Sequence, residues 1–172
     1  MTDRSRLATP SARRGFLALC GSTAAASALM LLGCSGSGRA ATTASFRLSD
    51  AEWRKRLSPE AYYVLRQAGT EPPFSSPLND EHRPGTFVCA GCALPLYSSA
   101  TKFDSGTGWP SFYDHLPHAI GESSDRSLLM TRTEVHCARC AGHLGHVFDD
   151  GPKPTGLRYC MNGVALRFIA RS

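Results

Sequence analysis

The sequence predicts a mainly β domain in which antiparallel strands follow a short helical N-terminal arm. From Thr86 onward, short strand-like runs alternate with Gly, Pro, Asp and Ser, which is typical of strands joined by turns. No long amphipathic helix interrupts these runs, so we expect an antiparallel rather than a parallel arrangement. Two start signals for helices precede the strands, and a chain of 172 residues suits a single domain.

Two short helices are predicted before the strands. The run Ser49–Glu52 fits a capping box, so "SDAEWRKRL" is expected to form a short helix. The run Ser58–Glu60 repeats the start signal with proline at the first helical position, and Gly69 is the expected C′ residue of "PEAYYVLRQAG". The next run, "TEPPFSSPLNDEHRPG", is predicted to be an extended loop because it is rich in proline and polar residues.

The predicted strands share short apolar or alternating patterns bounded by turn residues. They are "TFVC" (86–89), "SLLMTRTEVHC" (127–137), "HVFD" (146–149), "LRYCMN" (157–162) and "VALRFIA" (164–170).

Residues 1–33 are predicted to be an export signal that is removed. Four arginines and one aspartate precede an apolar run, and the adjacent Arg13 and Arg14 favour a twin-arginine signal. A plain secretory signal or a membrane anchor remains the alternative, because the apolar run is long enough to span a bilayer. Without these residues the net charge falls from +5 to +2, and no basic stripe interleaved with aromatics is present, so we expect no nucleic-acid partner.

The end of this segment, Leu31–Cys34, resembles a bacterial lipoprotein processing box, which predicts a lipidated Cys34 as the first mature residue. Residues 34–45 have the composition of a flexible linker, and residues 46–172 form the predicted globular domain. We therefore expect an exported lipoprotein that is anchored to the membrane through Cys34 and faces the periplasm of the cell envelope.

Two C-x-x-C motifs dominate the cysteine pattern. Two such knuckles supply the four thiolates of a tetrahedral structural zinc site. Two disulfides, or a redox-active C-x-x-C pair, are the alternatives in an oxidising compartment. The four predicted zinc ligands are Cys89, Cys92, Cys137 and Cys140. Since Cys20 lies in the signal and Cys34 in the processing box, Cys160 is left without a partner.

Cys160 is a candidate nucleophile. In a regular strand, Arg158, Cys160 and Asn162 point to the same side, and a neighbouring guanidinium favours the reactive thiolate. An inert cysteine in a core strand is the alternative. His143 and His146 are candidate proton donors that a bulge at Gly145 would turn to one face, although metal ligation or unrelated surface positions are also open.

Trp109 and Phe112 lie in the loop "KFDSGTGWPSF", which is rich in Gly, Ser and Pro. Aromatic side chains held by such a loop make a pocket for a methyl or thioether group, or they serve as ordinary core residues.

Together, "AGTEPPF", "CAGC", "FDSGTGWPSF", "CARCAGHLGHVFDDGP" and "LRYCMNGVALRF" closely resemble the methionine-R-sulfoxide reductase family, MsrB, from about Ser49 to Ile169. The resemblance implies two antiparallel β-sheets, one structural zinc on the four knuckle cysteines, and Cys160 as the nucleophile. It further implies that His143, His146 and Asn162 line the site, that Arg158 lies near the nucleophile, and that Trp109 and Phe112 hold the substrate methyl group. The expected activity is repair of methionine-R-sulfoxide, free or in proteins, under oxidative stress.

One departure from the family concerns the resolving thiol. Many members carry a cysteine in the loop before the tryptophan, and this chain has Thr107 there. We therefore expect the Cys160 sulfenic acid to be attacked directly by a thioredoxin-like or other external thiol. We also expect the chain to be a monomer. Two rival functions are a zinc-ribbon-like binding module with an inert Cys160 and an envelope thiol–disulfide oxidoreductase that uses Cys89 and Cys92. A second departure, Gly163-Val164 in place of the usual serine and alanine, is expected to matter little.

Overall fold

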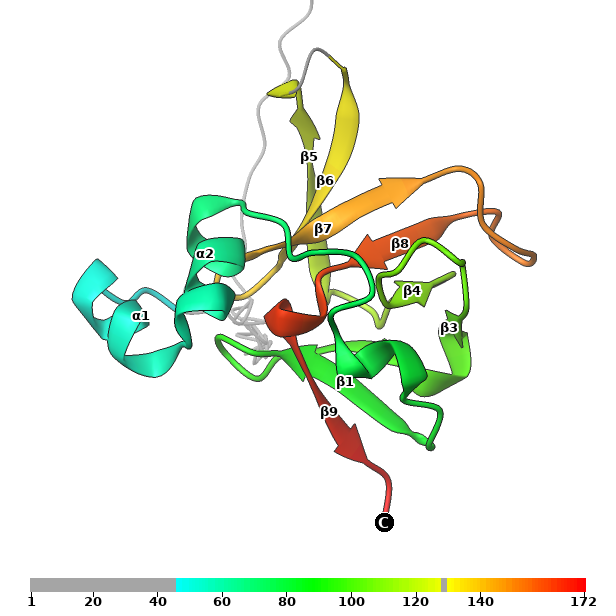
Figure 1. Ribbon diagram of the computed structural model, residues 1–172, viewed down its shortest axis with the longest axis horizontal. Coiled ribbons are helices and arrows are strands. Elements are labelled where there is room, and N and C mark those ends of the chain that lie inside the picture. Colours follow the sequence, from blue (N-terminus) through cyan, green and yellow to red (C-terminus); the bar gives the residue numbers. More distant parts are fainter. Residues whose placement is uncertain (1–45, 128–129) are drawn as a thin grey trace, which may run out of the picture. The chain divides into compact units, whose positions relative to one another are not determined.

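A computed structural model describes residues 46–127 and 130–172 of the chain (Figure 1). The predicted export signal, Cys34 and the linker to residue 45 lie outside these residues. Within the described residues, no helix combines the length and apolar character that a membrane crossing needs.

Two helices begin the described domain, and both begin where the sequence predicts. The N-cap residue of helix α1 (Asp50–Arg56) is Ser49, which forms the full capping box with Glu52. The N-cap residue of helix α2 (Pro59–Gln67) is Ser58, and proline follows it in the first turn. The left-handed C-cap of α2 is Ala68 rather than a glycine. Gly69 follows this residue, and a Cβ there would lie 2.2 Å from the ring of the exposed Tyr63, so that ring would have to move.

The first sheet has three antiparallel strands in the order β2-β1-β9. Strand β1 (Gly85–Cys89) pairs with β2 (Pro95–Ser98) on one side and with β9 (Leu166–Ala170) on the other. Its central residue Phe87 is fully buried and contacts the rings of Phe112 and Phe168. This sheet therefore pairs β9, the last strand of the chain, with β1 from the middle of the sequence.

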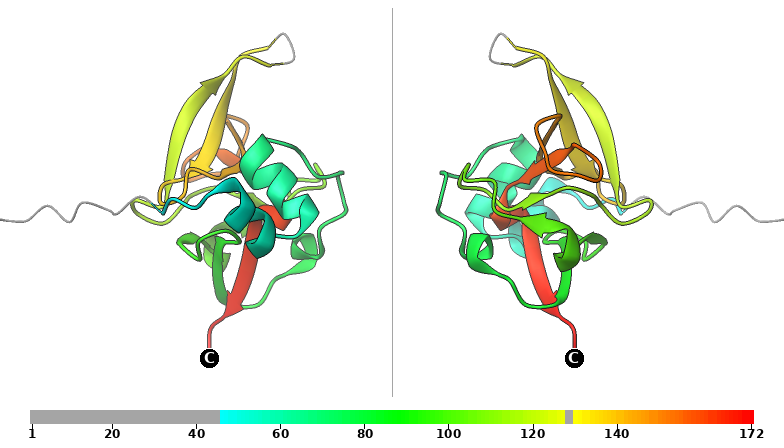
Figure 2. Two further views of the ribbon diagram at one scale, coloured as in Figure 1. Left: turned by 90° about the vertical axis from the view of Figure 1, so that its left-hand side faces the viewer. Right: turned by 90° about the vertical axis from the view of Figure 1, so that its right-hand side faces the viewer.

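The second sheet has six strands in the order β3-β4-β8-β7-β6-β5, all antiparallel. The strands are β3 (Lys102–Phe103), β4 (Ser111–Phe112), β5 (Ile120–Asp125), β6 (Arg132–Cys137), β7 (His143–Phe148) and β8 (Arg158–Met161). The β5–β6 hairpin extends beyond the other strands of its sheet (Figures 1 and 2). Helix α2 packs against β7, and so against the middle of this sheet.

Three short 3-10 helices complete the elements that concern the site: η1 (Pro77–Asp80), η2 (Ser99–Thr101) and η4 (Gly163–Ala165). Because η4 follows β8 directly and contacts α2 and η1, it links the Cys160 strand to the N-terminal arm. Buried aromatic and aliphatic side chains from both sheets and both helices form one core.

The expectation of a mainly β domain with two antiparallel sheets and a helical arm is confirmed. The sequence does not predict four of the strands, β2 to β5, because each is short or polar. The predicted strand 127–137 begins only at Arg132, and Val164 and Ala165 lie in η4 rather than in a strand.

Candidate active site and metal centre

The two C-x-x-C motifs form matching turns at the ends of two hairpins. In the first turn, Cys89 N–H donates to Leu94 O and Ala93 N–H donates to Cys89 O. In the second, Cys137 N–H donates to Gly142 O and Ala141 N–H donates to Cys137 O. Ala93 and Ala141 both adopt a positive φ, of 59° and 53°. Each turn begins at the last residue of a strand, so the ends of β1 and β6 bring the two turns close together.

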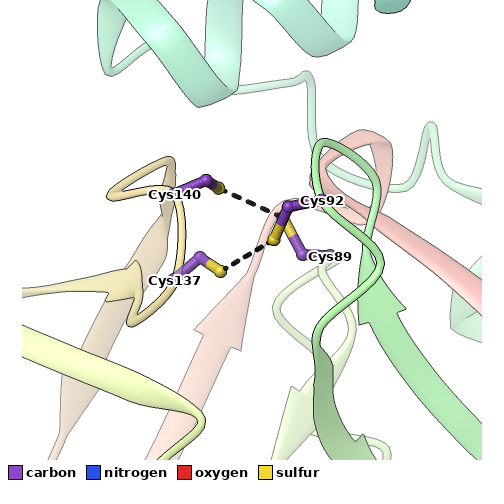
Figure 3. Close-up of side chains that lie close together, drawn as sticks. All are labelled: Cys89, Cys92, Cys137 and Cys140. Carbon is purple, nitrogen blue, oxygen red and sulfur yellow. Dashed lines mark hydrogen bonds between the residues drawn. The ribbon is translucent and has the colours of Figure 1, made fainter. Parts of the chain in front are cut away.

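All four sulfur atoms lie within 4.8 Å of one another and all four residues are buried (Figure 3). The closest pairs cross between the turns: Cys89 to Cys140 at 3.7 Å and Cys92 to Cys137 at 3.5 Å. A disulfide has an S–S length of about 2.05 Å, so these are free cysteines. Zn–S bonds of about 2.3 Å in a tetrahedron would separate the sulfurs by about 3.8 Å, so the residues fit one four-thiolate metal ion.

Cys160 lies in the middle of the six-stranded sheet. Its cross-strand neighbours are His146 in β7 and Ser111 in β4. The residue is half-buried and opens on a pocket of about 110 Å³. The pocket is lined by Thr70, Trp109, Arg132, Gly145, His146, Phe148, Cys160 and Asn162.

Strand β7 brings the two candidate histidines together by an irregularity in its pairing. His136 pairs with His143 and Val135 with Gly145, so Leu144 is the extra residue of a bulge. The two imidazole rings lie 5.4 Å apart between centroids. Gly145 leaves room for the neighbouring strand, since a Cβ there would lie 2.1 Å from Cys160 O.

Each histidine has its own carboxylate. His143 Nδ1 lies 2.7 Å from Glu134 Oε1, and His146 Nε2 lies 2.7 Å from Asp125 Oδ2. Both histidines line an adjacent pocket, but only His146 also lines the Cys160 pocket. The buried Nε2 of His143 has no hydrogen-bond partner among the described residues. The two imidazole rings therefore have different surroundings, and the sequence alone does not predict this difference.

The ion pairs around His146 set its electrostatics. Burial lowers the pKa of His146, and its hydrogen bond to Asp125 opposes that shift. Hydrogen bonds from the Ser127 N–H and hydroxyl, and then from His146, hold the pKa of Asp125 far below its ordinary value. Asp125 also contacts Arg132 Nη2 at 2.6 Å, so an ionised carboxylate is shared between His146 and Arg132.

Arg158 lies near the nucleophile but not in the pocket. Its Nε and Nη2 donate to the two carboxylate oxygens of Asp150, both at 2.8 Å, and its guanidinium lies 4.4 Å from the centre of the Phe148 ring. The hydrogen bonds to Asp150, and then the proximity of Cys160, raise the pKa of Arg158. The cation is therefore permanent, and it supports the pocket wall formed by Phe148.

Asn162 is nearly fully buried, and Glu71 ties it to the loop after α2. Asn162 Nδ2 donates to Leu144 O at 3.0 Å, and Glu71 N–H donates to Asn162 Oδ1 at 2.9 Å. The buried Glu71 carboxylate accepts hydrogen bonds from the backbone N–H groups of Gly163 and Val164. Glu71 therefore holds the chain just beyond the Cys160 strand.

Trp109 and Phe112, which the sequence pairs as pocket residues, are separated by the structure. Trp109 lines the pocket, and its Nε1 donates to Glu71 O at 3.1 Å. Phe112 is fully buried in the core, with its ring stacked 4.3 Å from Tyr97. Its strand β4 turns the side chain toward the first sheet, so Phe112 does not line this pocket, whereas Phe148 does.

Sequence reasoning also misses Thr70, Arg132, Asp125, Glu134 and Glu71 as parts of the site. Thr70 and Glu71 stand in "AGTEPPF", a motif to which the sequence alone assigns no role. The three others belong to the β5–β6 hairpin. Only the pairing of β6 with β7 carries them to the histidines, so no local pattern identifies them.

Comparison with known proteins adds a family. The SelR domain family matches residues 57–170. The chain is similar to the peptide methionine sulfoxide reductase MsrB of Thiobacillus denitrificans, at 55% identity over 121 residues that cover 70% of this chain and 92% of that protein. It is 57% identical over 122 residues to the MsrB of Leifsonia xyli, covering 70% and 88% of the two chains. It is 51% identical over 128 residues to the MsrB of Agrobacterium fabrum, covering 74% and 95%.

Proposed function

This chain belongs to the SelR family of methionine-R-sulfoxide reductases, MsrB, and on that premise we propose that it reduces the sulfoxide through a sulfenic acid on Cys160. The observation that carries the proposal is the position of Cys160, half-buried in a small pocket beside His146, Trp109 and Asn162. The other described cysteines are buried together at the metal centre, which leaves Cys160 as the thiol available for chemistry.

The reaction begins when the Cys160 sulfur attacks the sulfoxide sulfur in the pocket. The S–O bond of the sulfoxide breaks, its oxygen passes to Cys160, and methionine leaves. The thiol loses one proton and the transferred oxygen gains one, so the products are methionine and the sulfenic acid of Cys160. Trp109 and Phe148 supply apolar surface for the methyl group, and this role replaces the one expected of Phe112.

His146 is the better candidate for the proton transfer. It faces Cys160 across the β7–β8 pair and lines the same pocket. Because Nε2 donates to the ionised Asp125, Nδ1 is the nitrogen left to accept the thiol proton and return it to the oxygen. His143, which lines the adjacent pocket, is assigned to positioning His146. Asn162 and Arg158 hold the pocket walls around them.

Recycling requires a thiol from outside the described chain. Thr107 lies beside Cys160 and cannot form a disulfide, and the knuckle cysteines are buried at the metal centre. An external thiol, from a thioredoxin-like or other reductant, attacks the sulfenic acid and releases water. A second thiol then opens the mixed disulfide and restores Cys160.

We further propose that the bound metal is one structural zinc ion held by the four knuckle cysteines. Zinc with four thiolate ligands has no open position, so it stabilises the fold and leaves the chemistry to Cys160. The site connects the turn after β1 in one sheet with the turn after β6 in the other.

Mass spectrometry after one equivalent of methionine-R-sulfoxide, without reductant, tests the reaction. We expect one methionine per chain and a trappable sulfenic acid on Cys160, and neither with Cys160→Ser or with the S epimer. An intramolecular disulfide that includes Cys160 would contradict the one-cysteine scheme. Turnover with thioredoxin and with small thiols then identifies the class of reductant, and oxidised proteins can be compared with the free amino acid as substrates.

The cellular part of the proposal is an exported lipoprotein that repairs oxidised proteins in the cell envelope as a monomer. It rests on Arg13, Arg14 and the Leu31–Cys34 box alone. Labelling with a radioactive fatty acid tests it: Cys34→Ala should abolish the label, and Cys20→Ala, a matched control in the same segment, should not. A label that persists without Cys34 would contradict this anchor.

A further inference from the structure

Two arginines donate hydrogen bonds to the backbone of the first knuckle, Cys89–Cys92. Arg56, at the end of α1, donates from Nε to Gly91 O at 2.6 Å. Arg139, which belongs to the second knuckle, donates from Nη1 to Cys92 O at 3.1 Å. The first knuckle therefore receives one cationic donor from the helical arm and one from the knuckle that faces it.

A third arginine contacts the second knuckle, Cys137–Cys140. Arg66, in the last turn of α2, donates from Nη1 to Cys140 O at 3.0 Å, and its guanidinium lies 4.8 Å from the centre of the Trp53 ring. Trp53 of α1 is buried, and a Cβ on Gly91 would lie 3.2 Å from its ring. The two helices of the arm thus lie against the metal centre, α1 at the first knuckle and α2 at the second.

These three guanidinium groups have no carboxylate partner among the described residues. The lining of a pocket of about 450 Å³ on this face includes Arg47, Arg66 and Arg139 but no acidic residue. Like charges repel one another, so an anion close to them stabilises such a cluster. A zinc ion with four thiolates is a net anion, because the thiolate charges outnumber those of the divalent ion.

We propose, on the premise of the structural zinc site, that Arg56, Arg66 and Arg139 are positioning residues that offset the negative charge of the metal centre and slow the loss of the metal. Coulomb attraction stabilises the anionic centre, and the partly buried hydrogen bonds of the three side chains limit screening by water. Because α2 leads into the loop with Thr70, which lines the Cys160 pocket, the same attraction ties that loop to the metal centre.

Two variants of Arg66 separate its charge from its hydrogen bond. Arg66→Gln keeps an N–H donor and removes the charge, whereas Arg66→Lys keeps the charge. Groups that support metal ligands usually change metal affinity about 10- to 100-fold, so we expect Arg66→Gln to release zinc to an excess of a chromogenic chelator about tenfold faster than the unaltered chain. Arg66→Lys should stay within about threefold of the unaltered chain. Equal release rates for the two variants, or no effect of Arg66→Gln, would overturn the proposal.

Neighbouring positions of α1 supply a matched control for net charge. Arg56→Gln and Lys55→Gln each remove one positive charge, but no hydrogen bond joins the exposed Lys55 to either knuckle in the described part of the chain. Only Arg56→Gln should speed the release of zinc. An equal effect of both variants would show that the total charge of the helix matters and not contact with the knuckle, which contradicts the proposal.

Far-ultraviolet circular dichroism, recorded before the chelator is added, shows whether each variant keeps its helices. If Arg66→Gln loses them, Arg139→Gln carries the test, because Arg139 lies outside both helices. The zinc content of the unaltered chain separates the two levels of inference. A content near zero contradicts the metal site itself, whereas about one ion per chain, released at a rate that neither Arg66→Gln nor Arg139→Gln changes, contradicts only the role of the arginines.

Discussion

His146 Nε2 lies 2.7 Å from Asp125 Oδ2, and this contact commits one ring nitrogen to a carboxylate while the ring faces Cys160. Glu134 lies at the same distance, 2.7 Å, from Nδ1 of His143, which does not line the Cys160 pocket. The site therefore contains two carboxylate–histidine pairs of equal contact distance, one through Nδ1 of His143 and the other through Nε2 of His146. Replacing each carboxylate in turn by the corresponding amide therefore distinguishes the roles of the two histidines.

Asp125→Asn is expected to slow single-turnover reduction about tenfold or more, because the imidazolium formed during proton transfer loses a charged hydrogen-bond acceptor. The Asp125 charge raises the pKa of His146. Its removal lowers that pKa. Protonated His146 cannot accept the thiol proton, so the loss of activity on the acid side should move to lower pH. Rates measured from acid to alkaline pH check this.

Glu134→Gln is the matched control, since it alters the His143 pair and the Ser123 contact of the same carboxylate but leaves Asp125 and its contact with His146 in place. We expect its activity to fall at the same pH as that of the unaltered chain. If Glu134→Gln moves the profile and Asp125→Asn does not, His143 is the proton donor.

Thr107→Cys should convert the recycling scheme. The 3.8 Å contact of Thr107 with Cys160 places a new sulfur close to the sulfenic acid, and Gly106 and Gly108 flank this position in the loop. After one equivalent of sulfoxide, we expect the mass spectrum to show a disulfide between the introduced thiol and Cys160, and turnover with thioredoxin to be faster than in the unaltered chain. Ser105→Cys is the control, because Ser105 reaches the nucleophile only through Thr107. A persistent sulfenic acid in Thr107→Cys would contradict the prediction.

Glu71→Gln tests the buried carboxylate that holds the chain beyond Cys160. An amide offers one acceptor oxygen, so one of the two backbone N–H groups of Gly163 and Val164 loses its partner. A buried unsatisfied N–H costs roughly 1–3 kcal/mol, which should appear as a lower midpoint of denaturant unfolding. Glu60→Gln, at an exposed position in α2, should leave the midpoint nearly unchanged. An equal effect of both variants would show that burial of Glu71 does not matter.

The parts of the molecule that the sequence predicts are those encoded by local patterns. The capping box at Ser49 fixes the start of α1, and the two-residue spacing within each C-x-x-C motif suits the hydrogen-bonded turn that each motif forms. Gly145 in β7 is a further local signal, since only a residue without a Cβ permits the close approach of Cys160 O from β8.

The parts that it misses depend on the pairing of distant strands. Asp125 reaches His146 only because β5, β6 and β7 are consecutive in the sheet. The same dependence explains Phe112, whose aromatic character suits a pocket or a core equally well. Its pairing with Lys102 and Tyr159 decides in favour of the core.

A side chain at position 163 is predicted to destabilise the fold as long as Ser76 is present. The sequence, in contrast, gives the expectation that this position matters little. A Cβ on Gly163 would lie 1.8 Å from Ser76 Oγ and 2.5 Å from Ser76 Cβ. Gly163→Ala should therefore destabilise the fold by about 1–3 kcal/mol, the usual cost of overpacking. Ser76→Gly in the same chain removes both contacts and should recover part of that loss. Denaturant unfolding of the two single variants and the double variant measures the coupling, and simple additivity would contradict the contact.

Metal removal should separate stability from chemistry. The knuckle cysteines join the turn after β1 to the turn after β6, so an ion held by them ties the two sheets together. We expect about one zinc ion per chain, and a chelator or Cys137→Ser should lower the unfolding midpoint and abolish activity, because the free energy of binding a structural metal contributes to folding. Cys160→Ser is the control: it should keep the full metal content and the unfolding midpoint while losing all reduction of the sulfoxide. A chain that keeps its midpoint after complete removal of zinc would contradict a structural role for the tetrad, and loss of zinc from Cys160→Ser would show that Cys160 contributes to the metal centre.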